Sequence, residues 1–456
     1  MRLAGIVTVL GVLIGCQPSH RTKAADPLQP EGQRAATTRP ASAHDEAITL
    51  DLDVSLDARQ SVVWCATAQI AWAELGQRFG GAASLDPIHS NALRDAADDA
   101  TSLAMNQFPR EWVDQRKIVA EAGEFTQPWL SEVRAMVREK FGDDFETPLL
   151  DQLEASETPT DIATYSALHV LAPFKHVFPT RETTFGVGGD PNHASNGGME
   201  TSPIYHGFGI RRTSSPEGPE LALAAAQVII HWYTPPKRLL EVIGMSEGEP
   251  MEDAAADEVG YLVELKSTTS REHLLLARLG EPKSLRAAIA NAMRRFRNPN
   301  TRSVNQANVL EQISREGRSI EESIALMQNL DLADRLGPFD EFLAPLLTID
   351  AVRQYPSLLG RDFRSPEALR RYRLAMAGQS IRFSLNEKGA SLESEAALGG
   401  LFGGGTRIFD FSNPFLVMLV HDDAPWPYFA AWVGDDTFLM LAPPEKQPDA
   451  TEDPDL

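Results

Sequence analysis

The reactive side chains of this sequence are few, and their spacing matches no standard catalytic or metal-binding motif. Apolar residues surround Cys65 in "SVVWCATAQIAWAEL", without a basic or imidazole neighbour to activate the thiol, so we predict a small core residue. His193 and His206, with Asp190, could ligate a metal, but their spacing fits no known site. G-x-S-x-G, H-E-x-x-H, C-x-x-C and phosphate-binding loop motifs are missing. We therefore predict no catalytic residue, no metal site and no cofactor, and expect that the protein is not an enzyme.

The second cysteine, Cys16, indicates a covalent modification. Arg2 precedes an apolar run over residues 3–14, which is too short to span a bilayer and predicts a cleaved export signal over residues 1–15. The closing "LIGC" resembles a bacterial lipobox, in which the cysteine becomes the lipidated first residue. An ordinary signal peptide is the alternative. We expect acylation at Cys16, for example with palmitate, to anchor the exported protein to a bacterial membrane in the cell envelope.

Composition divides the rest of the chain. Residues 16–49 hold the lipidated cysteine and a tether rich in Pro, Ala, Ser and Thr, which cannot bury enough apolar surface to fold. We predict one folded domain over residues 50–441 and an acidic, disordered tail over residues 442–456. The formal net charge of −22 argues against a nucleic-acid partner and against electrostatic docking on anionic lipid.

The pattern of apolar residues predicts helices first and strands later. Helical spacing runs from Val63 to Phe79, where Gly80 ends it, and further helices are predicted over residues 91–105, 128–142, 284–296 and 304–332. Strands are predicted at "DIATYSALHVLAPF", "PIYHGFGI", "AAQVIIHWY", "GYLVEL", "HLLLARL" and "FLAPLLTI". His169 and His231 lie in such runs and are expected to be hydrogen-bonded structural histidines. Helices and strands that do not alternate favour the α+β class.

A long segment separates the strand at Ile381 from the one at Pro414. Its first part, "GASLESEAALGG", alternates small or apolar residues with polar ones, and a glycine-rich stretch follows. If this part were a strand, Ala390, Leu392 and Ser394 would face inward, and Glu393 would face solvent. Loops of such length are uncommon unless they are functional or disordered.

Several segments resemble the serpin family, in family order. The hinge-like "SLNEKGASLESEAALGG" contains Glu387, Lys388, Gly389 and Ala390. "FDFSNPFLVMLVHDDAPWPYFAAWVG" is similar to the serpin C-terminus with its two strands, and "FLAPLLTIDAVRQYPSLLG" to a Pro-containing strand before a short helix. "DIATYSALHVLAPFKHVF" is similar to the central sheet strand, and "QSVVWCATAQIAWAELG" to the buried early helix. Two departures are the missing asparagine of the central strand and the bulky residues of "SLES".

The resemblance implies a serpin-like α+β fold with N-terminal helices, mixed β-sheets and an exposed reactive-centre-like loop. It implies that the loop baits a serine or cysteine protease at Leu401, Phe402 and Gly403, and that the cleaved loop inserts as a strand. Such a bait suits a protease that prefers aromatic or large apolar residues. The alternative is a non-inhibitory binding or scaffold lipoprotein of the cell envelope. An envelope hydrolase or a solute-binding lipoprotein is a third, less favoured hypothesis.

Overall fold

The computed structural model describes the central part of the chain: residues 42–56, 60–86, 94–106, 108–151, 153–156, 158–185, 204–210, 223–234, 260–269, 271–297, 336, 340–391 and 408–441. Several predicted features lie outside these residues. They are the export signal, Cys16 and most of the tether, the helix over residues 304–332, the bait residues Leu401, Phe402 and Gly403, and the acidic tail.

The largest described sheet has six antiparallel strands in the order β1-β19-β18-β10-β9-β8. Their bounds are β1 (Val62–Cys65), β8 (Val228–Thr234), β9 (Gly260–Leu265), β10 (Glu272–Arg278), β18 (Phe415–His421) and β19 (Phe429–Val433). The strands β1, β9, β18 and β19 are buried along their whole length, which is typical of a sheet covered on both faces. This sheet forms the centre of the largest apolar core.

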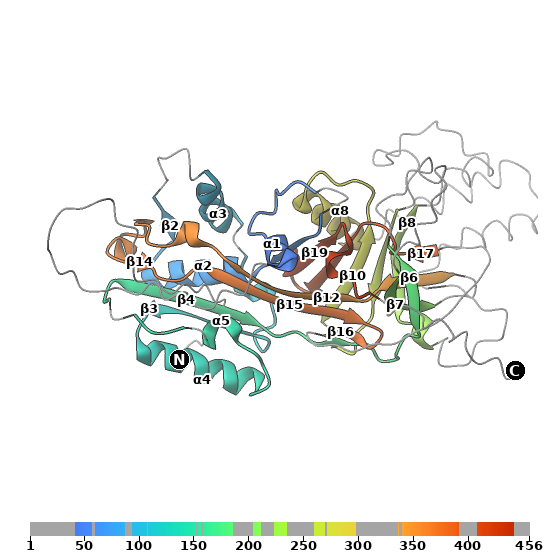
Figure 1. Ribbon diagram of the computed structural model, residues 1–456, viewed down its shortest axis with the longest axis horizontal. Coiled ribbons are helices and arrows are strands. Elements are labelled where there is room, and N and C mark those ends of the chain that lie inside the picture. The colour runs from blue at the N-terminus through green and yellow to red at the C-terminus, as the bar shows by residue number, and fades with distance from the viewer. Residues whose placement is uncertain are drawn as a thin grey trace, which may run out of the picture.

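Two smaller sheets lie against this centre, and the long strands β4 and β15 belong to different ones (Figure 1). One sheet has the order β12-β15-β16-β5, and the other has the order β14-β4-β3. Their bounds are β3 (Ile118–Glu124), β4 (Asp161–Leu168), β5 (Ala172–Pro173), β12 (Leu347–Gln354), β14 (Arg373–Leu374), β15 (Gly378–Asn386) and β16 (Gly389–Ser391). Because β5 follows β4 in the chain after only three residues, the two sheets meet at this point.

A further sheet has the order β17-β11-β7-β6, and β13 pairs with β2. Their bounds are β2 (Ser84–Leu85), β6 (Thr180–Thr184), β7 (Ile204–Ile210), β11 (Glu341–Pro345), β13 (Phe363–Ser365) and β17 (Ile408–Asp410). In Figure 1 the four-stranded sheet lies at the end of the molecule opposite to α4.

The described helices are mostly short or amphipathic. Their bounds are α1 (Ala43–Ala47), α2 (Thr67–Phe79), α3 (Arg94–Met105), α4 (Gln127–Phe141), α5 (Pro148–Asp151) and α8 (Leu285–Arg297), with 3-10 turns at Arg110–Trp112, Pro356–Leu358, Glu367–Leu369 and Asp436–Phe438. The helix α2 packs on β3 and β4 and ends at Gly80, whose φ of 89° suits glycine. Thr126 caps α4 by accepting a hydrogen bond from the backbone N of Trp129.

The predicted α+β class is confirmed, and the segments that resemble a serpin form the elements implied by that resemblance. The early helix is buried as α2, "DIATYSAL" is the central strand of its sheet, and the C-terminal segment forms β18 and β19. Pro345 ends β11, and the short helical turn at Pro356–Leu358 follows a separate strand, β12.

Three predicted boundaries were wrong. Val62–Cys65 is a strand rather than the start of a helix, because its valines and tryptophan suit a buried strand and a short apolar run has no diagnostic period. "FLAPLLTI" is divided between β11 and β12. The last residues of the predicted tether belong to the folded body: Ser42 and Asp45 form a capping box around α1, and Ile48 is fully buried.

Candidate functional site

The predicted hinge is a tight turn between two paired strands. The strand β15 ends at Asn386, and the chain reverses through Glu387 and Lys388 into β16, so that Asn386 lies opposite Gly389. The side-chain Oδ1 of Asn386 accepts a hydrogen bond from the backbone N of Lys388 at 2.9 Å, which stabilises the turn. Antiparallel pairing then continues with Leu385 opposite Ala390.

The strand β16 is also paired on its other side, with β5. Gly389 lies opposite Pro173, and Ala390 lies opposite Ala172. The turn itself is held by the same neighbouring segment, because the backbone N of Phe174 donates to the carbonyl O of Lys388 at 2.7 Å. The first residues of the long segment therefore lie between β15 and β5, and Ala390 is only 3% exposed.

Gly389 can occupy its position only because it lacks a side chain. Its φ of 144° lies in the region that favours glycine. A Cβ atom at this position would lie 2.6 Å from the carbonyl O of Ala172 and 2.6 Å from the Cα of Pro173. Both are backbone atoms and cannot move aside without disturbing β5. The glycine thus permits β16 to approach β5 closely.

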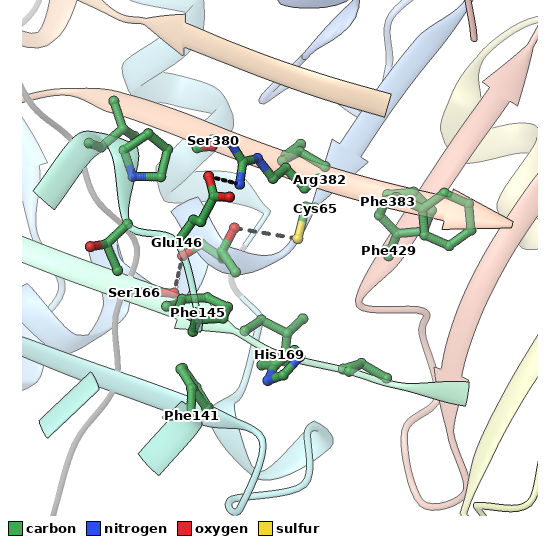
Figure 2. A pocket seen from close by; sticks show the side chains of 18 of the residues that line it. Cys65, Phe141, Phe145, Glu146, Ser166, His169, Ser380, Arg382, Phe383 and Phe429 are labelled. Carbon is green, nitrogen blue, oxygen red and sulfur yellow. Dashed lines mark hydrogen bonds and ion pairs between the residues drawn. The ribbon is translucent and has the colours of Figure 1, made fainter. Parts of the chain in front are cut away.

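A cleft of about 370 Å³ lies beyond β16, between β4 and β15 (Figure 2). Its walls come from residues 165–171 on one side and residues 380–383 on the other, and Phe141 and Phe145 line it from α4 and the loop that follows. Cys65, Thr67 and Phe429 line it from the elements beneath. The lining is mainly apolar.

Polar side chains hold each wall of the cleft to the start of α2. On the β15 side, the fully buried Nε2 of Gln379 donates to the carbonyl O of Cys65 at 3.1 Å and to Oγ1 of Thr67 at 2.9 Å. On the β4 side, Oγ of Ser166 donates to the carbonyl O of Thr67 at 3.0 Å. The two walls thus share α2 as a common support, which fixes the base of the cleft.

The rim of the cleft carries charged and aromatic groups. Arg382 of β15 forms ion pairs with Glu146 and with Asp350, the second at 3.2 Å. Across the cleft, His169 packs against Phe141 and Phe145, with ring centroids 5.7 and 5.2 Å apart. Figure 2 shows Arg382 and His169 on opposite sides of the opening.

Cys65 is a buried core residue, as predicted, although it ends a strand rather than lying in a helix. Its side chain is a free thiol that accepts a weak hydrogen bond from Oγ1 of Thr67 at 3.4 Å. Burial raises the pKa of the thiol above its ordinary value, and the bonds with Thr67 oppose this only in part. The structure thus gives Cys65 none of the activation that a nucleophile needs.

The predicted histidines have different environments. His206 is buried in β7, whereas His193 and Asp190 lie outside the described residues. His231 is hydrogen-bonded as predicted, through Nε2 to Oε2 of Glu264 at 2.8 Å. Within the described ranges, no three histidine, cysteine or carboxylate side chains are grouped as metal ligands. The described helices also include none that is long and apolar enough to cross a membrane.

Sequence reasoning singled out the segment that forms the turn between β15 and β16 but missed the cleft and its supports. The residues that form the cleft come from six separate segments, and only the assembled structure brings them together. Gln379 stands two residues before the predicted strand at Ile381 and has no motif of its own. Gln379 is recognisable as a support only because its polar side chain is fully buried, and burial is visible only in the structure.

No protein-family model matches the chain, and no curated protein matches it in sequence. Among solved structures it is similar to SRPN18 from Anopheles gambiae, with 10% identity and a TM-score of 0.40 over 88% of this chain and 99% of that one. It is also similar to a tumour-suppressing serpin, with 7% identity and a TM-score of 0.39 over 82% and 93%. Native protease nexin-1, solved with heparin, has 11% identity and a TM-score of 0.36 over 83% and 92%. Similarity at this level assigns no role to any residue of this chain.

Proposed function

We propose that this chain is a serpin-like protease inhibitor that inserts its cleaved loop into the cleft between β4 and β15. The observation that carries the proposal is the position of β16, which is paired on both edges directly before the cleft. A segment that enters a sheet as an added strand gains main-chain hydrogen bonds along both neighbours. The residues that follow β16 in the chain are the proposed occupant.

The register of β16 supports this occupant. If pairing with β15 continued, Leu392 would lie opposite Phe383, and Glu393 would lie opposite Arg382. Opposed residues of an antiparallel pair share a face of the sheet. Phe383 is buried against the core, whereas Arg382 lies at the rim. The apolar residue would therefore face the core, and the acidic residue would face a cation.

The opposite wall agrees with the same alignment. Continued pairing with β5 would bring Glu393 beside His169, on the other side of the cleft from Arg382. Continued pairing with either wall thus places the alternating residues of the segment on the faces expected from the sequence. The alternation alone would suit any edge strand, but the match to two separate walls favours this cleft.

The target in this proposal is a serine or cysteine protease that cleaves at Leu401, Phe402 or Gly403. Leu401 and Phe402 are the large apolar residues of the glycine-rich stretch, so a protease with a large apolar specificity pocket would select them. A cut at this point frees the segment after β16 from β17 and allows it to extend into the cleft. We also propose that acylated Cys16 holds the inhibitor on a bacterial membrane, with the residues up to Ser42 as its tether.

A non-inhibitory serpin-like protein is the second candidate, and Leu392 is the residue that favours it. Leu392 would enter the sheet beside Phe383, whose ring already stacks on that of Phe429, so that a large side chain would crowd these rings. Overpacking of this kind costs about 1–3 kcal/mol and would slow insertion. Slow insertion would let the protease finish its reaction and leave. The cleaved chain would then be stabilised without trapping an enzyme.

Thermal unfolding of the cleaved chain tests insertion. Chymotrypsin, which prefers aromatic residues, should cut at Phe402, and the melting temperature of the cut protein should rise because the segment gains strand pairing. Substitution of Ala390 is unsuitable as a control, because Ala390 is buried before any cut. We instead pair Ser394→Lys with Glu395→Lys, since these neighbours would face the core and the solvent, respectively.

The lysine at position 394 should abolish the rise in melting temperature, whereas the lysine at position 395 should leave it largely intact. Burial of an unpaired charge is costly, and an exposed charge is not. A cut wild-type chain whose melting temperature falls would overturn insertion. A denaturant-resistant complex with the protease would support the inhibitor, and stabilisation without such a complex would support the non-inhibitory candidate.

A further inference from the structure

Four ionisable side chains form a continuous chain across neighbouring strands of the six-stranded sheet. His231 lies on β8, Glu264 on β9, His273 on β10, and Asp422 directly follows β18. Nε2 of His231 lies 2.8 Å from Oε2 of Glu264, and Nδ1 of His273 lies 2.9 Å from Oε1 of the same carboxylate. Nε2 of His273 lies 2.6 Å from Oδ1 of Asp422. We refer to these four residues as the histidine–carboxylate chain.

A bulge in β8 brings His231 into this chain. The pairing of β8 with β9 shifts between Ile230 and Trp232, so that His231 is the extra residue. As a result, two consecutive side chains face α8: Phe296 packs on the ring of His231, and the guanidinium of Arg295 lies 3.5 Å from the ring centre of Trp232. A regular strand would direct one of the two to the opposite face.

The two contacts of His273 favour the protonated form of its ring. Ionised carboxylates only accept hydrogen bonds, and a neutral imidazole carries a single N–H. His273 faces a carboxylate oxygen at each ring nitrogen, so both contacts are hydrogen bonds only if both nitrogens are protonated. The geometry therefore fits the imidazolium. Loss of one proton would leave a nitrogen lone pair facing a carboxylate oxygen.

The end of α8 rests on this chain. The ring of Phe296 contacts both imidazoles edge-on, with centroid distances of 5.0 Å to each. Next to it, the guanidinium of Arg297 donates to the carbonyl O of Asp422 at 3.1 Å and to that of Ala424. A change in the position of Asp422 would thus be transmitted to α8 through Arg297.

The other charged groups around His273 come from each element packed against it. Arg271, just before β10, pairs with Asp422 and Asp423. The helix α8 contributes Arg295 and Arg297. His231 and Glu264 complete the set from β8 and β9. Carboxylates make the contacts to both ring nitrogens, while the arginines contact Asp422, Asp423, the carbonyls and Trp232, so the immediate surroundings of the ring favour a positive charge.

We propose that the histidine–carboxylate chain is a pH-sensitive latch, in which protonated His273 fastens the C-terminal end of α8 to the six-stranded sheet. At neutral and mildly acidic pH the imidazolium joins Glu264 to Asp422, and α8 stays docked. At higher pH the neutral imidazole can bond only one of the two carboxylates. When the remaining N–H stays with Glu264, Asp422 loses its hydrogen bond to His273, and the contacts of Arg297 and Phe296 with the sheet weaken.

The direction of the pH effect follows from linkage. Burial disfavours the charged ring, but the hydrogen bonds and charges of Glu264 and Asp422 outweigh it, so the pKa of His273 is raised above 6.5. A group whose pKa is higher in the folded state stabilises that state below its ordinary pKa, and the contribution is lost as the pH rises through the folded pKa. The latch therefore opens on the alkaline side.

Hydrogen exchange of the full chain tests the latch between pH 6 and pH 9. After correction for the intrinsic exchange rate, the opening constant of α8 should rise with pH relative to that of α2. The rise should be about tenfold for each unit by which the folded pKa of His273 exceeds its ordinary value. Asp422→Asn should flatten this dependence, because an amide can accept from the imidazolium or donate to the neutral ring. His176→Gln, outside the chain, is the control and should follow the wild type.

Two outcomes would overturn the proposal: an α8 opening constant that does not rise relative to that of α2, or an Asp422→Asn variant that rises like the wild type. Nitrogen NMR of histidine-labelled wild-type protein gives a test that needs no variant. At pH 6 both nitrogens of His273 should be protonated, and the ring should titrate above the ordinary histidine pKa of 6.5. A neutral His273 ring at pH 6 would contradict the latch directly.

Discussion

The ring of Phe383 on β15 stacks on the ring of Phe429 on β19, with centroids 4.5 Å apart and planes inclined by 26°. This contact joins the wall of the cleft to the six-stranded sheet beneath it. Together with Gln379 it holds β15 in place, so that the cleft keeps its shape although residues 380–383 of β15 pair only with β12 in the described part of the chain. A rigid edge suits the addition of a strand.

Replacement of Phe383 by alanine should destabilise the fold substantially. The side chain is 3% exposed, and loss of a buried phenylalanine costs about 3–5 kcal/mol because a cavity remains. Val352→Ala on β12, where the side chain is half-buried, is the matched control and should cost about 1 kcal/mol. Urea unfolding measures both. Equal losses would mean that the aromatic stack does not support β15.

Gly389→Ala should detach β16 from β5, because the new methyl group would meet the backbone of Ala172 and Pro173. Gly360→Ala is a matched control: its φ is 64°, and nothing lies within 4 Å of the added Cβ, so only backbone strain of about 1–2 kcal/mol applies. Limited digestion with elastase, which accepts small residues, should cut after Ala390 in the first variant only. Similar digestion of both variants would argue against the close approach at Gly389.

Cys16→Ala tests the anchor. We expect the variant to leave the membrane fraction and to keep the unfolding curve of the wild type, since Cys16 precedes the folded body. Cell fractionation with immunodetection measures the distribution. A variant that still sediments with membranes would show that another segment provides the attachment.

The loss of folding stability at acid pH should depend on Glu264. Burial alone would raise its pKa, but the hydrogen bonds and charges of His231 and His273 outweigh burial and lower it to about 2. A carboxyl group whose pKa is lowered by folding stabilises the folded state at pH values above its ordinary pKa near 4.5. This contribution is lost as the pH falls towards 2. Glu264→Gln should therefore cost ~3 kcal/mol near pH 6 and progressively less in acid.

Urea unfolding at pH 6, 4 and 3 measures this difference between wild type and variant. Glu367→Gln is the control, because the side chain of Glu367 is 87% exposed and its loss should change little at any pH. A Glu264→Gln variant whose deficit is the same at all three pH values would show that Glu264 contributes through packing rather than charge.

The elements with strong local signals were predictable from the sequence. Thr126, Pro128 and Gly142 delimit α4, and Gly80 ends α2, because caps and glycine act within one turn of the chain. Local chemistry thus determined these features. Alternation predicted an inward-facing Ala390 only for the inserted strand, whereas the structure already buries it in the intact chain.

Features that depend on distant segments were not predictable. The histidine–carboxylate chain joins residues from three strands with Asp422, which follows a fourth, and its members are separated by up to 191 positions between His231 and Asp422. Likewise, the strand Val62–Cys65 owes its conformation to pairing with β19, whose sequence lies far downstream. Tertiary pairing overrides the weak local preference of a short apolar run.

The doubly paired position of β16 has a kinetic consequence. Bringing a free strand to the edge of a sheet requires an entropic cost of loop closure before any pairing rewards it. Here the turn at Glu387 and Lys388 and the pairs formed by Gly389 and Ala390 already exist in the intact chain. Strand addition would then start from a nucleus and proceed by extension alone, one residue after another. Its rate would depend on the first side chain to enter, Leu392, rather than on a search for the correct register.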